Sequence, residues 1–199
     1  MEKSLALITD STCDIPLEWL EKYDIAVVPL TIVWNEQQYL DGIDITAEEF
    51  YERLDKVSFF PTTSQPTPQS FLSAYHVAAE KGYKEILVIS ISSAMSGTIL
   101  SARQAAEKSP IPVHIVDSKS NSMGLGWQVI AAARARESGS TLEVILSVIE
   151  KVRTSLAYYI SLDTMNYLFK GGRFGDAVKY FNSVLKIKPL ILVKHDSGT

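Results

Sequence analysis

The sequence predicts an α/β fold: an N-terminal Rossmann-like domain with a mostly parallel sheet, followed by the start of a second α/β domain. Short apolar runs such as residues 5–8 and 86–89 alternate with helical segments, a pattern typical of parallel βαβ units. These runs are continuously apolar, as expected for strands that are buried on both faces. We therefore expect residues 1–156 to form the first domain and residues 157–199 to begin the second.

The composition is that of a globular protein from a reducing compartment. Of the 199 residues, 46% are hydrophobic, and the net charge of −4 without any basic block argues against a nucleic-acid partner. The single cysteine, Cys13, excludes an internal disulfide framework and is interpreted as a small buried thiol. No apolar run is long enough to span a bilayer, and the first residues do not resemble a signal peptide. We expect a cytoplasmic protein without stable membrane insertion.

The first elements follow from local signals in the chain. Residues 5–8 form the first strand, and a helix opened by proline runs over residues 16–23, with Asp14 as its expected cap. Residues 25–34 are expected to form one second strand, and residues 38–40 to return as a short hairpin arm.

The middle of the chain combines helix starts with a proline-rich loop. Thr46 and Glu49 have the spacing of a capping box, which predicts a helix to about residue 54. Residues 60–68 hold three prolines and are expected to form a rigid, extended loop without regular structure, after which Thr67 caps the next helix. The further elements of this domain are expected at residues 68–81 (helix), 86–90 (strand), 99–107 (helix), 113–116 (strand), 123–137 (helix) and 141–155 (helix).

The pattern changes after residue 155. Residues 157–162 are expected to form a strand, residues 163–170 a helix that ends in Lys-Gly-Gly-Arg, residues 174–184 another helix, and residues 185–193 an extended segment. The last six residues resemble the entry to a hairpin turn. We expect the second domain to be truncated.

One strand-to-helix turn, residues 92–98 (Ser-Ser-Ala-Met-Ser-Gly-Thr), predicts a site for an anion. Small side chains let a ligand approach the backbone, and the first N–H groups of the following helix have no internal partner and lie at the positive end of the helix dipole. Because no lysine or arginine lies between Ser90 and Thr98, a carboxylate fits better than a triphosphate, although a distant arginine could complete the site. The alternative is an ordinary turn whose hydroxyls cap the helix.

Two other predicted strands end in similar polar turns, at residues 10–12 and 117–118. The carboxyl ends of parallel strands share one edge of the sheet, and ligands bind in the crevice outside that edge. We therefore expect all three turns to face one crevice. Asp10 and Asp117 are expected to accept hydrogen bonds from loop amides, because no ligand cluster of typical spacing predicts a metal site.

Several motifs, in this order along the chain, resemble those of the DegV family. They are Thr-Asp-Ser-Thr at residues 9–12, Asp-Gly-Ile-Asp-Ile-Thr at 41–46, Thr-Ser-Gln-Pro at 63–66, the turn at 92–98, Val-Asp-Ser at 116–118 and Lys-Gly-Gly-Arg at 170–173. The resemblance implies a two-domain α/β protein that binds one long-chain fatty acid between its domains. In Gram-positive bacteria such proteins present the acid to a separate fatty-acid kinase. They act as carriers rather than enzymes, with no cofactor besides the bound acid.

The resemblance also implies which residues hold the ligand. The carboxylate would be bound by Thr63 and Ser96, with help from Ser93 and from the amides of Gly97 and Thr98. Arg173, in the Gly-Gly-Arg motif, would supply a charge that meets the head group or the kinase. Family members normally continue beyond this length, where they supply a further histidine near the head group.

The alternative function is a serine-dependent hydrolase acting on an acyl substrate, with Ser96 as its nucleophile. Such an enzyme needs a histidine base, whereas Ser96 lies in Met-Ser-Gly rather than G-x-S-x-G, and His76 and His114 are interpreted as structural. A kinase is disfavoured further, because the phosphate-binding lysine and the glycine-rich loop are missing from the sequence. A third alternative is a structural fragment that binds no ligand.

Overall fold

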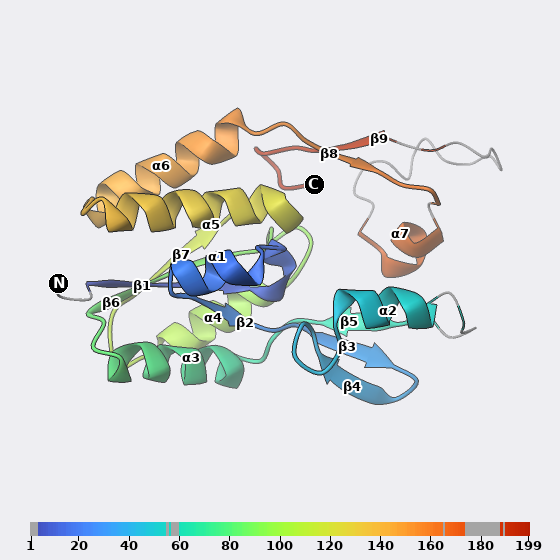
Figure 1. Ribbon diagram of the computed structural model, residues 1–199, viewed down its shortest axis with the longest axis horizontal. Coiled ribbons are helices and arrows are strands. Elements are labelled where there is room, and N and C mark those ends of the chain that lie inside the picture. Colours follow the sequence, from blue (N-terminus) through green and yellow to red (C-terminus); the bar gives the residue numbers. More distant parts are fainter. Residues whose placement is uncertain (1–3, 55, 57–59, 165, 174–187, 189) are drawn as a thin grey trace.

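The computed structural model describes residues 4–54, 56, 60–164, 166–173, 188 and 190–199. Its centre is a four-stranded parallel sheet in the order β2-β1-β6-β7 (Figure 1). The inner strand β1 places Leu7 between Ile25 of β2 and Leu87 of β6. The four strands are β1 (Leu5–Asp10), β2 (Ile25–Val28), β6 (Glu85–Ser90) and β7 (Val113–Asp117). The predicted α/β class with a mostly parallel sheet is confirmed.

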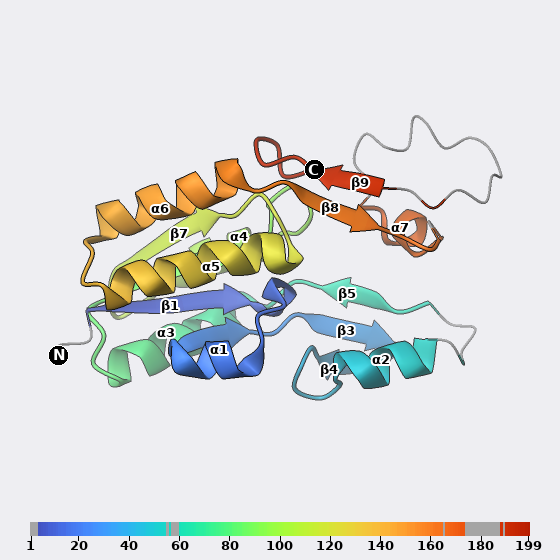
Figure 2. The ribbon, with the colours of Figure 1, turned by 45° about the horizontal axis from the view of Figure 1, so that its top comes forward.

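Helices cover both faces of this sheet and enclose two hydrophobic cores (Figure 2). Leu5 and Leu7 of β1 pack toward α5 and α6, whereas Ala6 and Ile8 pack toward α3 and α4, because successive side chains of a strand point to opposite faces. None of the helices in the described part of the chain has the length and apolar character needed to cross a membrane. The helices are α1 (Leu17–Lys22), α3 (Pro68–Glu80), α4 (Thr98–Ala106), α5 (Ser122–Glu137) and α6 (Leu142–Ser155).

A second, smaller lobe consists of a three-stranded antiparallel sheet and one helix. It contains β3 (Thr31–Trp34), β4 (Gln37–Leu40), β5 (Thr62–Ser64) and α2 (Ala47–Leu54), in the sheet order β4-β3-β5. Ile32, Trp34 and Ile45 form its core, onto which Phe50 of α2 packs. The predicted hairpin arm at residues 38–40 is confirmed as part of β4.

Two expectations about this lobe were wrong. The single strand expected at residues 25–34 is two strands in different sheets, because β2 ends at Val28 and the chain turns away at Pro29, which has no N–H for a ladder. The loop at residues 60–68 is not free of regular structure, since Thr62–Ser64 forms the edge strand β5 against β3. These three residues keep their N–H groups between the flanking prolines, and an edge strand needs a partner on one side only.

Helix starts agree with the predicted caps, with one exception. The Thr67 hydroxyl accepts a hydrogen bond from the Ser70 amide at 3.1 Å. In the capping box, the Glu49 amide donates to Thr46 Oγ1 at 3.2 Å, and the Thr46 amide donates to Glu49 Oε2 at 2.9 Å. Asp14 is not the cap of α1, because Pro16 occupies that position and no side chain bonds the helix start.

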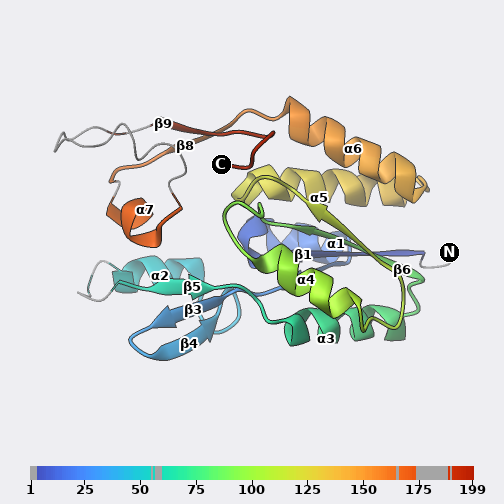
Figure 3. The same cartoon turned by 180° about the vertical axis from the view of Figure 1, so that it is seen from behind.

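The region after α6 contributes a separate two-stranded antiparallel sheet and a short helix. These are β8 (Tyr158–Ser161), β9 (Leu190–Val193) and α7 (Asn166–Gly171), and α7 lies next to the smaller lobe when the molecule is seen from behind (Figure 3). The strand expected at residues 157–162 is confirmed as β8. The helix expected at residues 174–184 lies outside the described residues, and the division into domains at residues 156 and 157 remains a prediction.

Candidate functional site

The three polar turns do meet at one edge of the parallel sheet. Asp10 Oδ2 at the end of β1 accepts a hydrogen bond from the Ile91 amide, after β6, at 2.8 Å. Asp117 Oδ1 at the end of β7 accepts one from the Ser93 amide at 3.2 Å. The turn after β6 is therefore held from both sides by carboxylates that end the neighbouring strands.

Asp10 is a fully buried carboxylate that organises the turn after β1. Its Oδ1 atom accepts hydrogen bonds from the amide and the hydroxyl of Thr12, at 3.1 and 2.5 Å. Burial raises the pKa of the Asp10 carboxyl, while the donors of Thr12 and Ile91 oppose that shift. The expectation that this carboxylate binds loop amides is confirmed. Within the described ranges, no group of three or more His, Cys, Asp or Glu side chains could hold a metal ion.

Asp117 holds Ser93, one of the predicted ligand residues. Asp117 accepts hydrogen bonds from the Ser93 hydroxyl at 2.5 Å and from the Lys119 amide at 2.9 Å, besides the Ser93 amide. Both donors of Ser93 are thus engaged within the protein. The carboxylate fixes the shape of the turn through Ser93, and Asp117 also binds amides as expected.

Ser96 is the residue of the turn best placed to donate to a ligand. Its hydroxyl lies 2.9 Å from the Thr98 hydroxyl and 3.4 Å from the Thr98 amide. Either hydroxyl of this pair could be the donor, but Thr98 has no exposed surface and its hydroxyl makes no other hydrogen bond to a described residue, so we assign Thr98 as the donor to Ser96. The hydrogen of the half-buried Ser96 then remains for a ligand. The Gly97 amide makes no hydrogen bond to any described residue, so the turn presents one hydroxyl and one N–H.

The contacts of Ser96 also bear on the alternative that the hydroxyls of this turn only cap the following helix. The Ser96 hydroxyl does accept a hydrogen bond from the Thr98 amide, but the distance of 3.4 Å is long for such a bond. The N-cap position of α4 is Gly97, which has no side chain to cap the helix. The hydroxyl of Ser96 is therefore only weakly committed to the helix.

Thr63 lies on β5, opposite Ile32 of β3, and is exposed. No hydrogen bond within the described chain joins Thr63 to Ser96. The two segments meet through Gln65, whose Nε2 atom donates to Ser101 Oγ of α4 at 3.0 Å. The importance of Gln65 was not predicted, although its place in the Thr-Ser-Gln-Pro motif was a signal for it.

Arg173 lies beside this turn, which contains no lysine or arginine of its own. Its Nε atom donates to the Met95 carbonyl at 3.5 Å, next to Ser96 in the chain, although 78 residues separate donor and acceptor. Arg173 also donates to the Gly171 carbonyl at 2.5 Å. The distant arginine that the sequence left open is thus placed at the turn.

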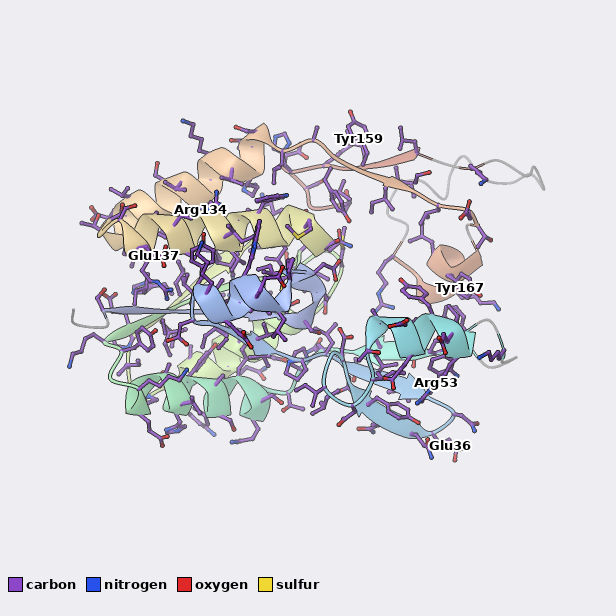
Figure 4. The ribbon with its side chains drawn as sticks, viewed as in Figure 1. Glu36, Arg53, Arg134, Glu137, Tyr159 and Tyr167 are labelled. Atoms are coloured by element: carbon purple, nitrogen blue, oxygen red, sulfur yellow. The ribbon has the colours of Figure 1, made fainter. Side chains whose placement is uncertain are left out.

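Aromatic contacts hold α7 in this position. The rings of Phe60 and Tyr167 stack with centroids 5.6 Å apart, and Lys170 Nζ lies 5.2 Å from the centre of the Phe60 ring. Tyr167 projects from the side of α7 that faces the smaller lobe (Figure 4). Phe60 precedes β5, so the same chain segment supports both Thr63 and α7.

The last residues of the chain reach the same edge of the sheet. The hydroxyl of Ser92, which is fully buried, donates to the Gly198 carbonyl at 2.8 Å, and Lys119 Nζ donates to the Asp196 carbonyl at 2.6 Å. A turn closed by the hydrogen bond from the Lys194 amide to the Thr199 carbonyl thus rests on the turns after β6 and β7.

No histidine lies within hydrogen-bonding distance of Ser96. His76 is exposed on α3, and His114 Nε2 lies 2.9 Å from Glu85 Oε2, near the other end of the parallel sheet. His195 contacts Arg153 through its carbonyl. The described residues therefore form no pair of nucleophile and base at the turn.

Comparisons with known proteins give a consistent picture. A family model described as "Uncharacterised protein, DegV family COG1307" matches residues 4–198. The DegV domain-containing protein CPE1310 of Clostridium perfringens is 39% identical over 190 residues, which cover 95% of this chain and 68% of that protein. The DegV domain-containing protein SCO2569 of Streptomyces coelicolor is 36% identical over 191 residues, covering 96% and 68%.

Solved structures with the same fold are described as fatty-acid-binding proteins. A DegV family protein from Thermus thermophilus, described by its fatty-acid binding, superimposes with a TM-score of 0.89 at 34% identity, covering 98% of this chain and 69% of that one. A stearic acid-binding protein from Eubacterium ventriosum superimposes with a TM-score of 0.88 at 30% identity, covering 98% and 67%.

Proposed function

The chain belongs to the DegV family, and from this premise we propose that it binds a long-chain fatty acid between its two α/β domains and presents the carboxylate to a separate fatty-acid kinase. The fatty acid is the ligand named for the structural relatives from T. thermophilus and E. ventriosum. In this proposal the protein is a carrier that works in the cytoplasm.

The observation that carries the proposal is the set of donors at the turn after β6. Within the turn at residues 92–98, the Ser96 hydroxyl and the Gly97 amide are the neutral donors that no described residue engages. A helix start and neutral donors suit a single negative charge, and the guanidinium of Arg173 adds a cation without the clustered lysines of a polyphosphate site. A fatty-acid carboxylate matches this arrangement in charge and in size.

Thr63 would provide the second hydroxyl, from the far side of the crevice. It lies on a short strand between Pro61 and Pro66, whose fixed backbone angles limit how far the segment can shift. Thr98 and Ser93 would act indirectly, since the Thr98 hydroxyl would donate to Ser96 and Ser93 is held by Asp117.

The acyl tail would supply most of the affinity. Burying one methylene group contributes about 0.8 kcal/mol, so a long alkyl chain outweighs the few hydrogen bonds at its head group. The head-group contacts would then fix the orientation of the acid, with its carboxylate at the sheet edge. Arg173 is exposed there, so it would be free to meet the charge that phosphorylation adds.

The hydrolase alternative is weakened by the surroundings of Ser96. Its hydroxyl contacts Thr98 and no histidine, so it is not activated as a nucleophile. Turnover of an acyl ester that is lost in the Ser96→Ala variant would reverse this preference.

The proposal is tested by extracting the purified protein under denaturing conditions and analysing the extract by mass spectrometry. We expect a stoichiometric fatty acid in the wild type and its depletion in a Thr63→Ala/Ser96→Ala double variant. A Thr62→Ala/Ser147→Ala variant is the matched control, since it removes one exposed hydroxyl next to Thr63 on β5 and another on α6. A wild type that neither carries a fatty acid nor binds an added one would contradict the proposal.

A further inference from the structure

The amide group of Gln65 lies directly on Gly97. A Cβ atom built on Gly97 would lie 2.0 Å from Gln65 Oε1 and 2.9 Å from Gln65 Cδ, and Cβ atoms in proteins essentially never come this close to such neighbours. The same amide donates through Nε2 to Ser101 Oγ, one turn further along α4, and Ser101 is buried. Gln65 therefore spans the first turn of α4 from the loop that follows β5.

The conformation of Gly97 shows what the glycine is needed for. Its backbone angles, φ −77° and ψ 8°, are open to every residue type, so no left-handed conformation requires glycine here. What an alanine would lack is room for the amide of Gln65. The small residue at position 97 is explained by this contact.

From this contact we infer that Gln65 is a positioning residue of the ligand site: it fixes the strand that carries Thr63 against the turn that carries Ser96. Thr63 and Ser96 have no hydrogen bond to each other, and Gln65 is two residues from Thr63 and packs on the residue after Ser96. The distance between the two hydroxyls thus depends on this side chain. The inference rests on the proposed function, which makes those hydroxyls partners of one carboxylate.

The expected size of the effect follows from the hydrogen bond that is lost. A neutral hydrogen bond contributes about 0.5–1.5 kcal/mol, which corresponds to a roughly two- to tenfold change in an equilibrium constant. We therefore expect Gln65→Ala to weaken fatty-acid binding by roughly two- to tenfold. Gln104→Ala, which removes an exposed glutamine from α4, serves as the control and should bind like the wild type.

The test of the mechanism is a double-mutant cycle with Gly97→Ala. The new methyl group would displace the end of the flexible Gln65 side chain, so Gly97→Ala should weaken binding about as much as Gln65→Ala, and the double variant no more than either single one. Additive losses would overturn the inference, because they would mean that the two residues act separately. Wild-type affinity in Gln65→Ala would overturn it as well.

A second variant tests whether Gln65 lies beside the carboxylate of the bound acid or only supports the fold. Gln65→Glu keeps the size of the side chain but brings a negative charge to Gly97. It should weaken binding of a fatty acid more than binding of the corresponding fatty alcohol, since only the acid is repelled. Equal losses for both ligands would contradict the placement of Gln65 at the carboxylate.

Hydrogen exchange of the ligand-free protein keeps the inference testable even if the proposed function fails. Peptides covering residues 62–65 and 97–101 should exchange faster in Gln65→Ala than in the wild type, whether or not any fatty acid binds. Unchanged exchange in both peptides would overturn the positioning role itself, whereas faster exchange in a protein without fatty-acid affinity would contradict the proposed function alone.

Discussion

The Asp10 carboxylate and the Ile91 amide are joined by a 2.8 Å hydrogen bond between the ends of β1 and β6. Asp10 has no exposed surface, and Ile91 is 7% exposed. The bond fixes the direction in which the chain leaves β6, immediately before the residues that approach the proposed ligand. A buried acid thus supports the site without touching it.

We expect Asp10→Asn to lower the free energy of unfolding by about 2 kcal/mol, because it leaves a buried donor without an acceptor. One oxygen of Asp10 faces the Ile91 amide and the other faces Thr12, so an asparagine NH₂ must point at a donor in either orientation. Denaturant unfolding measures the change. Asp14→Asn is the control on an exposed aspartate, with an effect expected within about 0.5 kcal/mol.

The cost of Asp10→Asn should also depend on pH. Because burial raises the pKa of Asp10 in the folded protein, the folded state binds a proton more tightly than the unfolded chain. The stability that this provides is complete below the unfolded pKa and is lost as the pH rises through the folded one. The difference between wild type and variant should therefore grow as the pH is lowered from 7 toward 4, and a difference that shrinks would contradict this.

Gly198→Ala should detach the C-terminal turn from the turn after β6 (residues 92–98). A Cβ atom there would lie 2.2 Å from Ser92 Oγ and 3.0 Å from Lys119 Cα, and the φ angle of +71° adds strain for alanine. Gly139 has a similar φ of +74° but nothing within 4 Å, so Gly139→Ala isolates the backbone cost of about 1 kcal/mol. We expect the Lys194 amide to lose its protection from hydrogen exchange in Gly198→Ala and to keep it in Gly139→Ala.

Cys13 should be almost inert toward thiol reagents in the folded protein. Burial raises its pKa to about 12, and 3% of the residue is exposed. At pH 8, such a pKa leaves roughly one thiol in ten thousand ionised, and the thiolate is the reactive form. Labelling with a disulfide reagent should therefore proceed only in denaturant. The signal is unambiguous because the chain has one cysteine, and rapid labelling without denaturant would show that the thiol is accessible.

The sequence was most informative where the signal is local. The Thr46 and Glu49 box and the Thr67 cap were predicted because cap and helix lie within a few residues of each other. The parallel sheet was predicted from alternating strands and helices, since such units combine in few ways. β5 was missed because it forms only against β3, about thirty residues earlier in the chain.

The candidate site also contains a part that local sequence signals predicted and a part that depends on distant contacts. Sequence motifs pointed to the turn after β6, but the hydrogen bond that commits Ser93 to Asp117 depends on how the ends of β6 and β7 meet. The contact of Gln65 with Gly97 crosses thirty-two residues and depends on a side-chain conformation. Such pairs cannot be found from spacing alone.

Tyr167→Ala should loosen α7 and with it the contact of Arg173 with Met95 in the turn after β6. The stacked pair of Phe60 and Tyr167 is worth about 0.5–1.5 kcal/mol beyond its buried area, so amides of residues 166–173 should exchange roughly two- to tenfold faster without the ring. Tyr167→Phe keeps the stack and should exchange like the wild type. Tyr159→Ala is the matched control, because Tyr159 lies on β8 with 56% of its surface exposed and points away from α7 (Figure 4). If Tyr167→Ala and Tyr159→Ala leave residues 166–173 equally protected, the stack does not hold α7, and the position of Arg173 must be set by its contact with Met95 instead.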